Sequence, residues 1–268
     1  MMKLKNVKTL LAMLLAFPLL ACVSNPPSTS KVCHTDIFGQ LKPGGLGKMD
    51  TQIDTFEQDT DETRKQCQQM AKEGNANAQL YVGKMYAQGV GVEKDEEEAI
   101  QWTKKAAEQG LAEAQIILGM AYLAGKGVER DEAEGLRLLK MGAERGPAVA
   151  QFVLGAIYFF GTFDVEQNQT EGLKWFRKAA EQGLAEAQNT LGMMYSVGFG
   201  TSQDKAEAMK WFRKAAKQGN ADAQYELGKM YADGEGVAQN KAEAMKWYKK
   251  AAEQEHAKAQ FALEMMEE

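Results

Sequence analysis

The stretch Ala208–Tyr231 reads AMKWFRKAAKQGNADAQYELGKMY, and its framework recurs six times between residue 59 and residue 268. A glutamine preceded by Ala-x-Ala marks each copy, at spacings of 36, 36, 37, 36 and 36 residues. These marker glutamines are Gln79, Gln115, Gln151, Gln188, Gln224 and Gln260. A fixed period of this length is typical of stacked repeats, in which no single unit can bury its apolar face alone. Because such arrays present extended surfaces, the first expectation is binding rather than catalysis.

Each repeat is predicted to hold two antiparallel helices. The first begins at an Asp or Asn that is followed three residues later by Glu, a capping-box pattern that satisfies free backbone N–H groups. The predicted caps are Asp59, Asp95, Asp131, Asn168, Asp204 and Asn240. The first helix should end at a left-handed glycine, at Gly74, Gly110, Gly146, Gly183 or Gly219. The second should end near Gly89, Gly125, Gly161, Gly198 and Gly234.

A further series of glycines lies inside the second helix, four residues after the marker glutamine. A glycine in a helix costs about 1 kcal/mol relative to alanine, so a repeated series needs a packing reason. We expect two helices to approach closely there, with tryptophan rings filling the space nearby. The glycines are Gly83, Gly119, Gly155, Gly192 and Gly228, and the tryptophans are Trp102, Trp175, Trp211 and Trp247.

The predicted fold class is therefore all-α, an α/α superhelical solenoid of six helix-pair repeats of about 36 residues each. The predicted repeats span residues 59–94, 95–130, 131–167, 168–203, 204–239 and 240–268. The last repeat has Glu255 and Glu264 where earlier repeats have glycine. Such changes would suit a polar terminal repeat that faces water.

The pattern Ala-x-x-Trp-x-x-Lys-Ala-Ala-x-Gln-Gly-x-Ala-x-Ala-Gln-x-x-Leu-Gly-x-x-Tyr is complete at Ala208–Tyr231. It closely resembles the Sel-one-like repeat (SLR), a relative of the tetratricopeptide repeat, and the resemblance covers about four-fifths of the chain. It implies a right-handed α/α superhelix that binds peptides or folded proteins, often as an adaptor in bacterial envelopes. The third repeat departs from the pattern, with Leu138 at the tryptophan position.

The balance of charges argues against several functions. The chain has 32 Lys and Arg against 37 Asp and Glu, a formal net charge of −5, so it lacks the basic footprint of a nucleic-acid-binding protein. Its only histidines, His34 and His256, lie near opposite ends, which argues against a zinc cluster or a histidine-based triad. We therefore expect no cofactor, no metal site, no catalytic residue and no nucleic-acid partner, and we expect a monomer.

Residues 1–21 have the marks of a signal peptide. Three lysines precede a short apolar run that ends in small residues, and the run is interrupted by Pro18 and too short to span a bilayer. Leu19-Leu20-Ala21-Cys22 resembles the bacterial lipobox, in which the cysteine is acylated. The absence of aspartate after Cys22 then favours the outer membrane, with the protein on its periplasmic face or at the cell surface. An ordinary secreted protein with an incidental cysteine is the alternative.

Residues 22–32 are rich in Pro and Ser and are predicted to be a lipidated tether, and residues 33–58 an irregular cap. If Cys22 is acylated, Cys33 and Cys67 remain as a pair in an oxidising compartment. A disulfide between them would hold the cap against the first repeat and contribute roughly 3 kcal/mol. Two free thiols, with Cys67 filling an apolar position, are the alternative.

The connector after the third repeat's second helix breaks the pattern. It is one residue longer than its equivalents and contributes Phe159, Phe160 and Phe163, and the next connector contributes Phe199. Because exposed aromatic residues often anchor partners, these four form our predicted partner-binding site. The alternative is that the rings fill the space left by Leu138.

Basic residues form two columns on the first helices. The first column is Arg137, Lys174, Lys210 and Lys246; the second is Lys104, Lys140, Arg177, Arg213 and Lys249. An acidic peptide could lie along them. The alternative is a solvated face, in which Glu108, Glu144, Glu181 and Glu253, four residues after the second column, form helix-stabilising pairs.

The function predicted from the sequence is a non-enzymatic, lipid-anchored envelope scaffold that binds a protein or peptide. A β-lactam-binding or β-lactamase-like protein is one alternative, because cysteine-rich relatives in the resembled family have been described so. The tetrapeptide Ser28-Thr29-Ser30-Lys31 matches Ser-x-x-Lys, but it lies in the tether without the Ser-Asp-Asn or Lys-Thr-Gly partner motif. A surface-exposed protein that interacts with host molecules is a further alternative.

Overall fold

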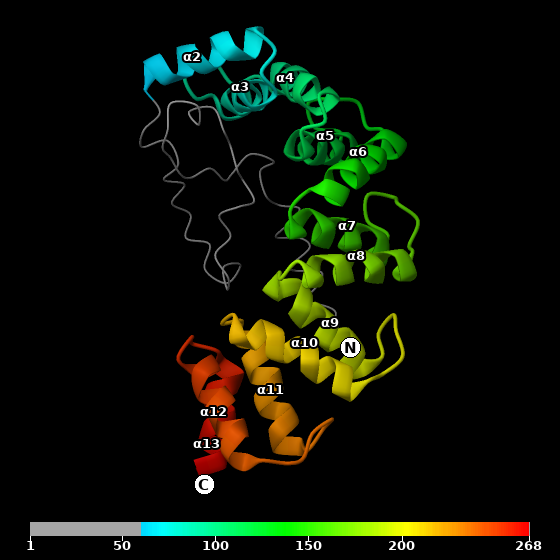
Figure 1. The fold of residues 1–268 in the computed structure, drawn as a ribbon, viewed down its shortest axis with the longest axis vertical. Helices are drawn as coiled ribbons and strands as arrows, with labels where there is room; N and C mark the ends of the chain where they lie inside the picture. The colour runs from blue at the N-terminus through cyan, green and yellow to red at the C-terminus, as the bar shows by residue number, and fades with distance from the viewer. Residues whose placement is uncertain (1–59, 268) are drawn as a thin grey trace. The chain divides into compact units, whose positions relative to one another are not determined.

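The structure of the protein is a computed structural model, which describes residues 60–267. These residues form twelve α-helices and no strand, arranged as antiparallel pairs (Figure 1). They divide into two compact units, residues 60–167 and residues 168–267. The predicted all-α fold of repeated helix pairs is thus confirmed. The predicted signal peptide, tether and cap, with Cys22 and Cys33, lie outside the described residues.

The first unit contains three helix pairs. Their bounds are Asp61–Lys72 (α2), Ala76–Gln88 (α3), Glu96–Glu108 (α4), Ala112–Ala124 (α5), Glu132–Arg145 (α6) and Ala148–Phe160 (α7). The second unit contains three more. Their bounds are Gln169–Glu181 (α8), Ala185–Val197 (α9), Lys205–Lys217 (α10), Ala221–Asp233 (α11), Lys241–Ala252 (α12) and Ala257–Glu267 (α13).

Side-chain caps start the first helix of every pair, but only half of the predicted capping box forms. The Asp or Asn side chain accepts from the backbone N–H of the glutamate three residues on, as between Asp204 and Glu207 (2.9 Å). The backbone N–H of the cap does not need that glutamate in return, because it donates to the carbonyl of a tyrosine in the preceding helix, as from Asp204 to Tyr195 (2.9 Å). In the first repeat the prediction was wrong by one residue, because Thr60 rather than Asp59 is the cap.

Left-handed glycines end the helices as predicted, with one exception. Gly89, Gly125, Gly161, Gly198 and Gly234 cap the second helices with φ between 64° and 73°. Gly74, Gly110, Gly183 and Gly219 follow the first helices, also with positive φ. Gly146 is instead extended (φ −97°, ψ −173°). The reason is Pro147, because a proline disfavours helical backbone in the residue before it.

The glycines inside the second helices mark close contacts between helices, as predicted. A Cβ on Gly192 would lie 2.6 Å from the Phe212 ring, and one on Gly228 would lie 2.5 Å from the Tyr248 ring. The contacting side chain is therefore the residue after the tryptophan of the next first helix, not the tryptophan itself. Trp175, Trp211 and Trp247 are buried, each with a lysine ammonium over its ring.

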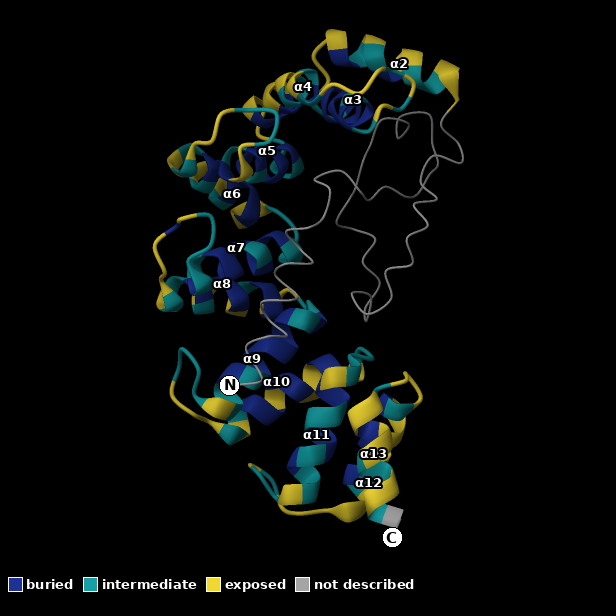
Figure 2. Ribbon diagram, turned by 180° about the vertical axis from the view of Figure 1, so that it is seen from behind, coloured by how far each residue is buried: buried dark blue, intermediate teal, exposed yellow. Residues whose placement is uncertain are grey.

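The marker glutamines connect the repeats. Each of the five from Gln79 to Gln224 donates its side-chain amide to a carbonyl eight residues earlier, at the end of the paired first helix. Three of them also accept from a glutamine thirty residues later, in the following repeat. A second helix is thereby fixed to both neighbouring first helices. Figure 2 shows that in the first four pairs the second helices, α3, α5, α7 and α9, are more buried than the first helices.

Candidate partner-binding surfaces

The aromatic connector of the first unit leaves only part of its predicted site accessible. Phe159 is 1% exposed, so the core-filling alternative holds for this ring. It packs edge-on against Phe160, with ring centroids 5.2 Å apart. Phe160 and Phe163 are partly exposed. Of the three predicted binding residues in this unit, only Phe160 and Phe163 are therefore accessible, and Phe159 packs beneath Phe160.

The backbone of this connector is strained. Phe163 and Asp164 both have positive φ, 58° and 63°, although neither is glycine. A left-handed conformation costs a non-glycine residue roughly 1 kcal/mol, and bulky residues rarely adopt it. Arg130 holds the turn by donating to the Phe163 carbonyl (2.6 Å) and by forming an ion pair with Asp164 (2.7 Å). Strain of this kind is typical of functional sites, where surrounding contacts maintain it.

The connector is also fixed from its far side. Val165 is buried, and the Gln167 side chain donates to the Phe159 carbonyl (3.0 Å). The Thr162 hydroxyl is buried and has no hydrogen-bond partner among the described residues. The connector that carries the rings of Phe160 and Phe163 is thus held by Arg130 on one side and by Gln167 on the other.

Phe199, the fourth predicted residue, belongs to the second unit. It directly follows Gly198, the cap of α9, and its backbone N–H donates to the Met194 carbonyl (3.0 Å). Its ring is partly exposed.

The two basic columns are largely occupied by neighbours. Every member of the first column pairs with the glutamate three residues before it, and Arg137 does so through two hydrogen bonds of 2.7 Å to Glu134. These bonds hold the pKa of the Glu134 carboxyl below its ordinary value. In the second column, Arg213 donates to the Tyr231 hydroxyl (2.9 Å) and Lys140 lies over the Tyr158 ring. Within residues 60–267, the basic residues of the second column do not form the predicted ion pairs with the glutamates four residues after them. The first column, by contrast, fits the alternative of a solvated face, because each of its members pairs with a glutamate of its own helix.

Cys67 is fully buried in α2 and takes part in a disulfide. Its partner cysteine lies outside the described residues, so the pairing with Cys33 stays a prediction. The Ser28–Lys31 tetrapeptide also lies outside them. Within residues 60–267, no group of His, Cys, Asp and Glu side chains is arranged to hold a metal ion. No helix in that range has the length and apolar character needed to cross a membrane.

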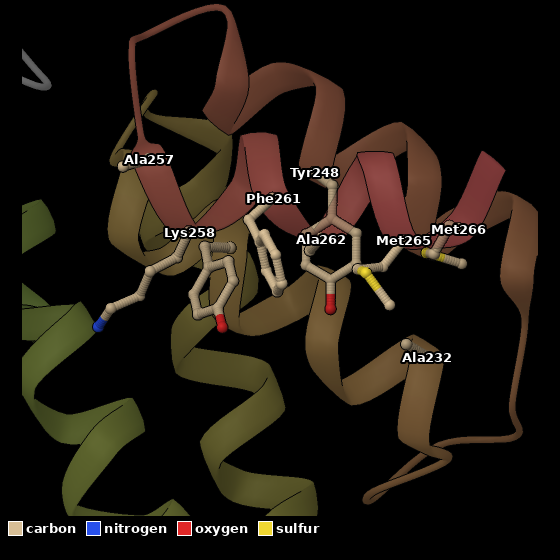
Figure 3. Close-up of a pocket in the computed structure, with 9 residues that line it drawn as sticks. Ala232, Tyr248, Ala257, Lys258, Phe261, Ala262, Met265 and Met266 are labelled. Atoms are coloured by element: carbon tan, nitrogen blue, oxygen red, sulfur yellow. The ribbon is translucent and has the colours of Figure 1, made fainter. Parts of the chain in front are cut away.

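Sequence reasoning missed an apolar groove of about 550 Å³ in the second unit (Figure 3). It runs along α13 past Lys258, Phe261 and Met265, and Tyr225 of α11 and Tyr248 of α12 complete it. Phe261 is 63% and Met265 57% exposed. Burial raises the pKa of the Tyr248 hydroxyl. The signal in the sequence was the pair of large apolar residues one and five positions after the last marker glutamine.

The groove corrects the prediction of a polar terminal repeat. Glu264 is exposed, and Glu255 keeps the left-handed backbone of the glycine that it replaces (φ 62°). Between them, however, Phe261 and Met265 leave an apolar face on α13. Glutamate at the two glycine positions therefore changes the contacts of this helix without making it polar.

Comparison with known proteins was consistent with this architecture. Residues 76–111, 112–147, 148–184, 185–220 and 221–256 each match the family model described as the Sel1 repeat. No curated protein matches the chain.

Two solved structures are similar in both sequence and fold. One is c5321, described as a protective antigen present in uropathogenic Escherichia coli strains and displaying an SLR fold, with 39% identity and a TM-score of 0.70. The other is a Sel1 repeat protein from Oxalobacter formigenes, with 36% identity and a TM-score of 0.64. Each match covers 76% of this chain but only 43% and 59%, respectively, of the matched chain.

Proposed function

Because the chain belongs to the Sel1 repeat family, whose members typically mediate protein–protein interaction, we propose that it is a non-enzymatic, lipid-anchored envelope scaffold. It binds a protein or peptide partner through the connector that carries Phe160 and Phe163. The observation that carries this proposal is the strained turn, in which two non-glycine residues are held left-handed by Arg130.

Three physical features support a contact surface at this connector. Aromatic side chains supply large contact areas at low entropic cost, which makes them frequent anchors. The support of Phe160 by the buried Phe159 keeps the ring in place before binding, so less entropy is lost when a partner docks. The Arg130–Asp164 ion pair adds a polar rim beside the rings.

Partner capture in the envelope tests the connector. We expect Phe163→Ser and Phe160→Ser to reduce capture of a crosslinked partner, identified by mass spectrometry, without lowering the thermal midpoint by more than a few degrees. Met141→Ser is the matched control, because Met141 is also an exposed apolar residue of the first unit (40%). Equal capture by all variants would remove the connector from the function, and unfolding of the connector variants would assign their rings to the core.

Lipid anchoring at Cys22 has a separate test. Several acyl chains hold a protein on a membrane where one alone binds only marginally. We expect Cys22→Ala to abolish labelling by a palmitate analogue and to release the protein from the outer-membrane fraction. Unchanged labelling and unchanged fractionation would contradict the anchor, without bearing on the connector.

A further inference from the structure

The first helices of the two units differ in charge, although both units repeat the same pattern. In the second unit, α8, α10 and α12 contain twelve lysines and arginines against four glutamates. In the first unit, α2, α4 and α6 contain eight basic residues against nine acidic ones. Basic residues in a last turn stabilise a helix through its dipole, but this effect acts equally in both units. The repeat pattern therefore does not account for the excess of positive charge in the second unit.

Two arginines of this excess are oriented by tyrosine hydroxyls. Arg177 of α8 donates to the hydroxyl of Tyr195, and Arg213 of α10 donates to that of Tyr231 (2.9 Å). The two pairs occupy the same positions in successive repeats. Both arginines donate through Nη2, and neither forms an ion pair within residues 60–267. A neutral hydroxyl orients a guanidinium without neutralising it, so the other N–H groups stay available to an anion.

The equivalent positions of the first unit have a different chemistry. Both are lysines, Lys104 and Lys140, and an ammonium lacks the planar fork that binds a carboxylate through two parallel hydrogen bonds. The pKa of Glu134 is lowered by its hydrogen bond with Arg137 and, to a smaller extent, by the charge of Lys104. Lys104 thus acts on a carboxylate of its own unit. Arginine held by tyrosine is, among the described repeats, a feature of the second unit.

The lysines next to these positions are also held in place. Each lies over the ring of a tryptophan three residues earlier, with its ammonium 4.0–4.7 Å from the ring centroid. These lysines are Lys178, Lys214 and Lys250, and each directly follows a member of the second basic column. Cations that are already ordered lose less entropy when they bind an anion. The second unit thus presents a basic surface made of Arg177, Lys178, Arg213, Lys214, Lys249 and Lys250.

We propose that this basic surface binds an extended acidic segment of a partner protein. Carboxylates fit the guanidinium fork, and bidentate pairs of this kind are among the stronger hydrogen bonds in proteins. Opposite charge also speeds the encounter of the two partners and fixes their register. The surface belongs to the second unit, whereas the aromatic connector belongs to the first, so the inference does not depend on the connector.

An anionic membrane fits the basic surface less well than an acidic polypeptide. Helices that lie on a membrane bury apolar side chains in addition to their charged contacts. The large apolar residues that are exposed within residues 60–267 are Met141, Val197, Phe261 and Met265. None of them lies on α8, α10 or α12. The basic surface therefore offers charge and hydrogen-bond donors, but no apolar side chain to insert.

Binding of a labelled acidic peptide to the full chain tests the proposal. The probe is a fluorescein-labelled peptide of about ten glutamates, roughly 33 Å long when extended, and its anisotropy is measured in an uncharged detergent. We expect binding that weakens at least about tenfold between roughly 50 and 500 mM salt, because salt screens exposed charges. A peptide of the same length made of serine should not bind.

A pair of charge-matched variants separates the basic surface from net charge. Arg177→Gln combined with Arg213→Gln should weaken binding of the probe at least about tenfold. Lys229→Gln combined with Lys258→Gln removes the same charge from second helices of the same unit, and should weaken binding less than about threefold. Equal losses in the two double variants would overturn the proposal.

The tyrosines test the geometry without a change of charge. Tyr195→Phe combined with Tyr231→Phe leaves both arginines in place but removes the hydroxyls that orient them. We expect binding to weaken about threefold, because the guanidinium groups must then be ordered by the peptide. Unchanged binding would contradict the role of the Arg–Tyr pairs. Circular dichroism confirms that each variant is folded.

A competition experiment distinguishes the acidic peptide from a lipid surface. Phosphatidylglycerol included in the detergent micelles should not displace the probe. Displacement would assign the basic surface to lipid headgroups and overturn the proposal, as would a probe that does not bind at low salt. Phe163→Ser should leave binding of the probe unchanged, so failure of this proposal is distinguishable from failure of the connector.

Discussion

Gln109 donates a side-chain hydrogen bond of 2.7 Å to Oε1 of Gln79, thirty residues earlier and in the preceding repeat. Gln79 in turn donates to the carbonyl of Ala71 (3.2 Å), so a single side chain connects three helices. The same arrangement recurs around Gln188 and Gln224. The marker glutamine therefore recurs because its side chain donates to a carbonyl at the end of one first helix and accepts from a glutamine at the end of the next first helix.

Replacing a marker glutamine should destabilise its unit. Gln224→Leu removes two hydrogen bonds, the one that Gln224 donates to the Ala216 carbonyl and the one that it accepts from Gln254. The Ala216 carbonyl keeps its bond from the Gly219 backbone N–H (3.1 Å). A net hydrogen bond contributes about 0.5–1.5 kcal/mol, so we expect a loss of about 1–3 kcal/mol in the free energy of unfolding, measured with urea. Gln254→Ala is the milder control, because Gln254 is exposed and its loss leaves Gln224 bonded to Ala216. Equal losses in the two variants would contradict the bridging role.

A methyl group at Gly192 should be destabilising in a way that depends on Phe212. The added Cβ would lie 2.6 Å from the Phe212 ring, so Gly192→Ala should cost about 1–3 kcal/mol of unfolding free energy by overpacking. Phe212→Leu reduces the ring to a smaller side chain. In a double-mutant cycle monitored by urea unfolding, we expect the two substitutions together to cost less than the sum of their separate costs. Strict additivity would mean that Gly192 serves another purpose.

The fold was predictable because the same capping and packing residues recur in six copies of the repeat. Helix caps, terminal glycines and the packing glycines all follow from steric or hydrogen-bonding requirements that act within one or two repeats. The errors arose where a tertiary contact replaced a local one. The carbonyl of Tyr195 took the backbone N–H of Asp204 that a capping box would assign to Glu207, and Pro147 changed the backbone of Gly146.

The candidate sites were less predictable. The extra residue in the third connector pointed to the aromatic connector. The sequence did not show which ring is buried, because Phe159 and Phe160 are adjacent phenylalanines at the end of one helix. The prediction that the terminal repeat is polar and faces water depended on Glu255 and Glu264 alone. The exposure of Phe261 depends on what packs against α13, which no local pattern contains.

The hydrogen bond between His256 and Asp222 should contribute to stability in a pH-dependent manner. Nε2 of His256 lies 3.1 Å from Asp222, and this hydrogen bond is the main cause that lowers the pKa of Asp222 below its ordinary value of 3.8. A lowered native pKa gives stability that is present above the unfolded pKa and lost as pH falls through the native one. Because Asp222 is 66% exposed, we expect less than about 1 kcal/mol.

The substitution His256→Asn tests the contribution of the contact with Asp222 to stability. His256 accepts from the backbone N–H of Ala259 as the cap of α13, and asparagine makes the equivalent cap at Asn75 and Asn220. The variant should therefore keep the cap, but lose the contact with Asp222 and the stacking of the imidazole on the Tyr225 ring (4.9 Å between ring centroids). We expect the parent chain's stability advantage to be larger at pH 5 than at pH 3, because protonation of Asp222 removes the contribution of the contact, measured by urea midpoints. A difference that stays constant over this range would rule out Asp222 as its source.

Phe163 should show opposite effects on stability and binding. Asparagine adopts the left-handed conformation more readily than phenylalanine, so Phe163→Asn should leave the free energy of unfolding unchanged or raise it by up to about 1 kcal/mol. Partner capture should nevertheless fall. A loss of stability would show that the ring contributes more to the core than its strained backbone costs.

The most direct test of the scaffold function is photo-crosslinking in the producing cells. A photoreactive phenylalanine analogue is placed at Phe163 and, in a separate variant, at Met141 as an exposed apolar control in the same unit. We expect one discrete adduct with an envelope protein from position 163 and none from position 141. No adduct from position 163, or the same adducts from both positions, would contradict it.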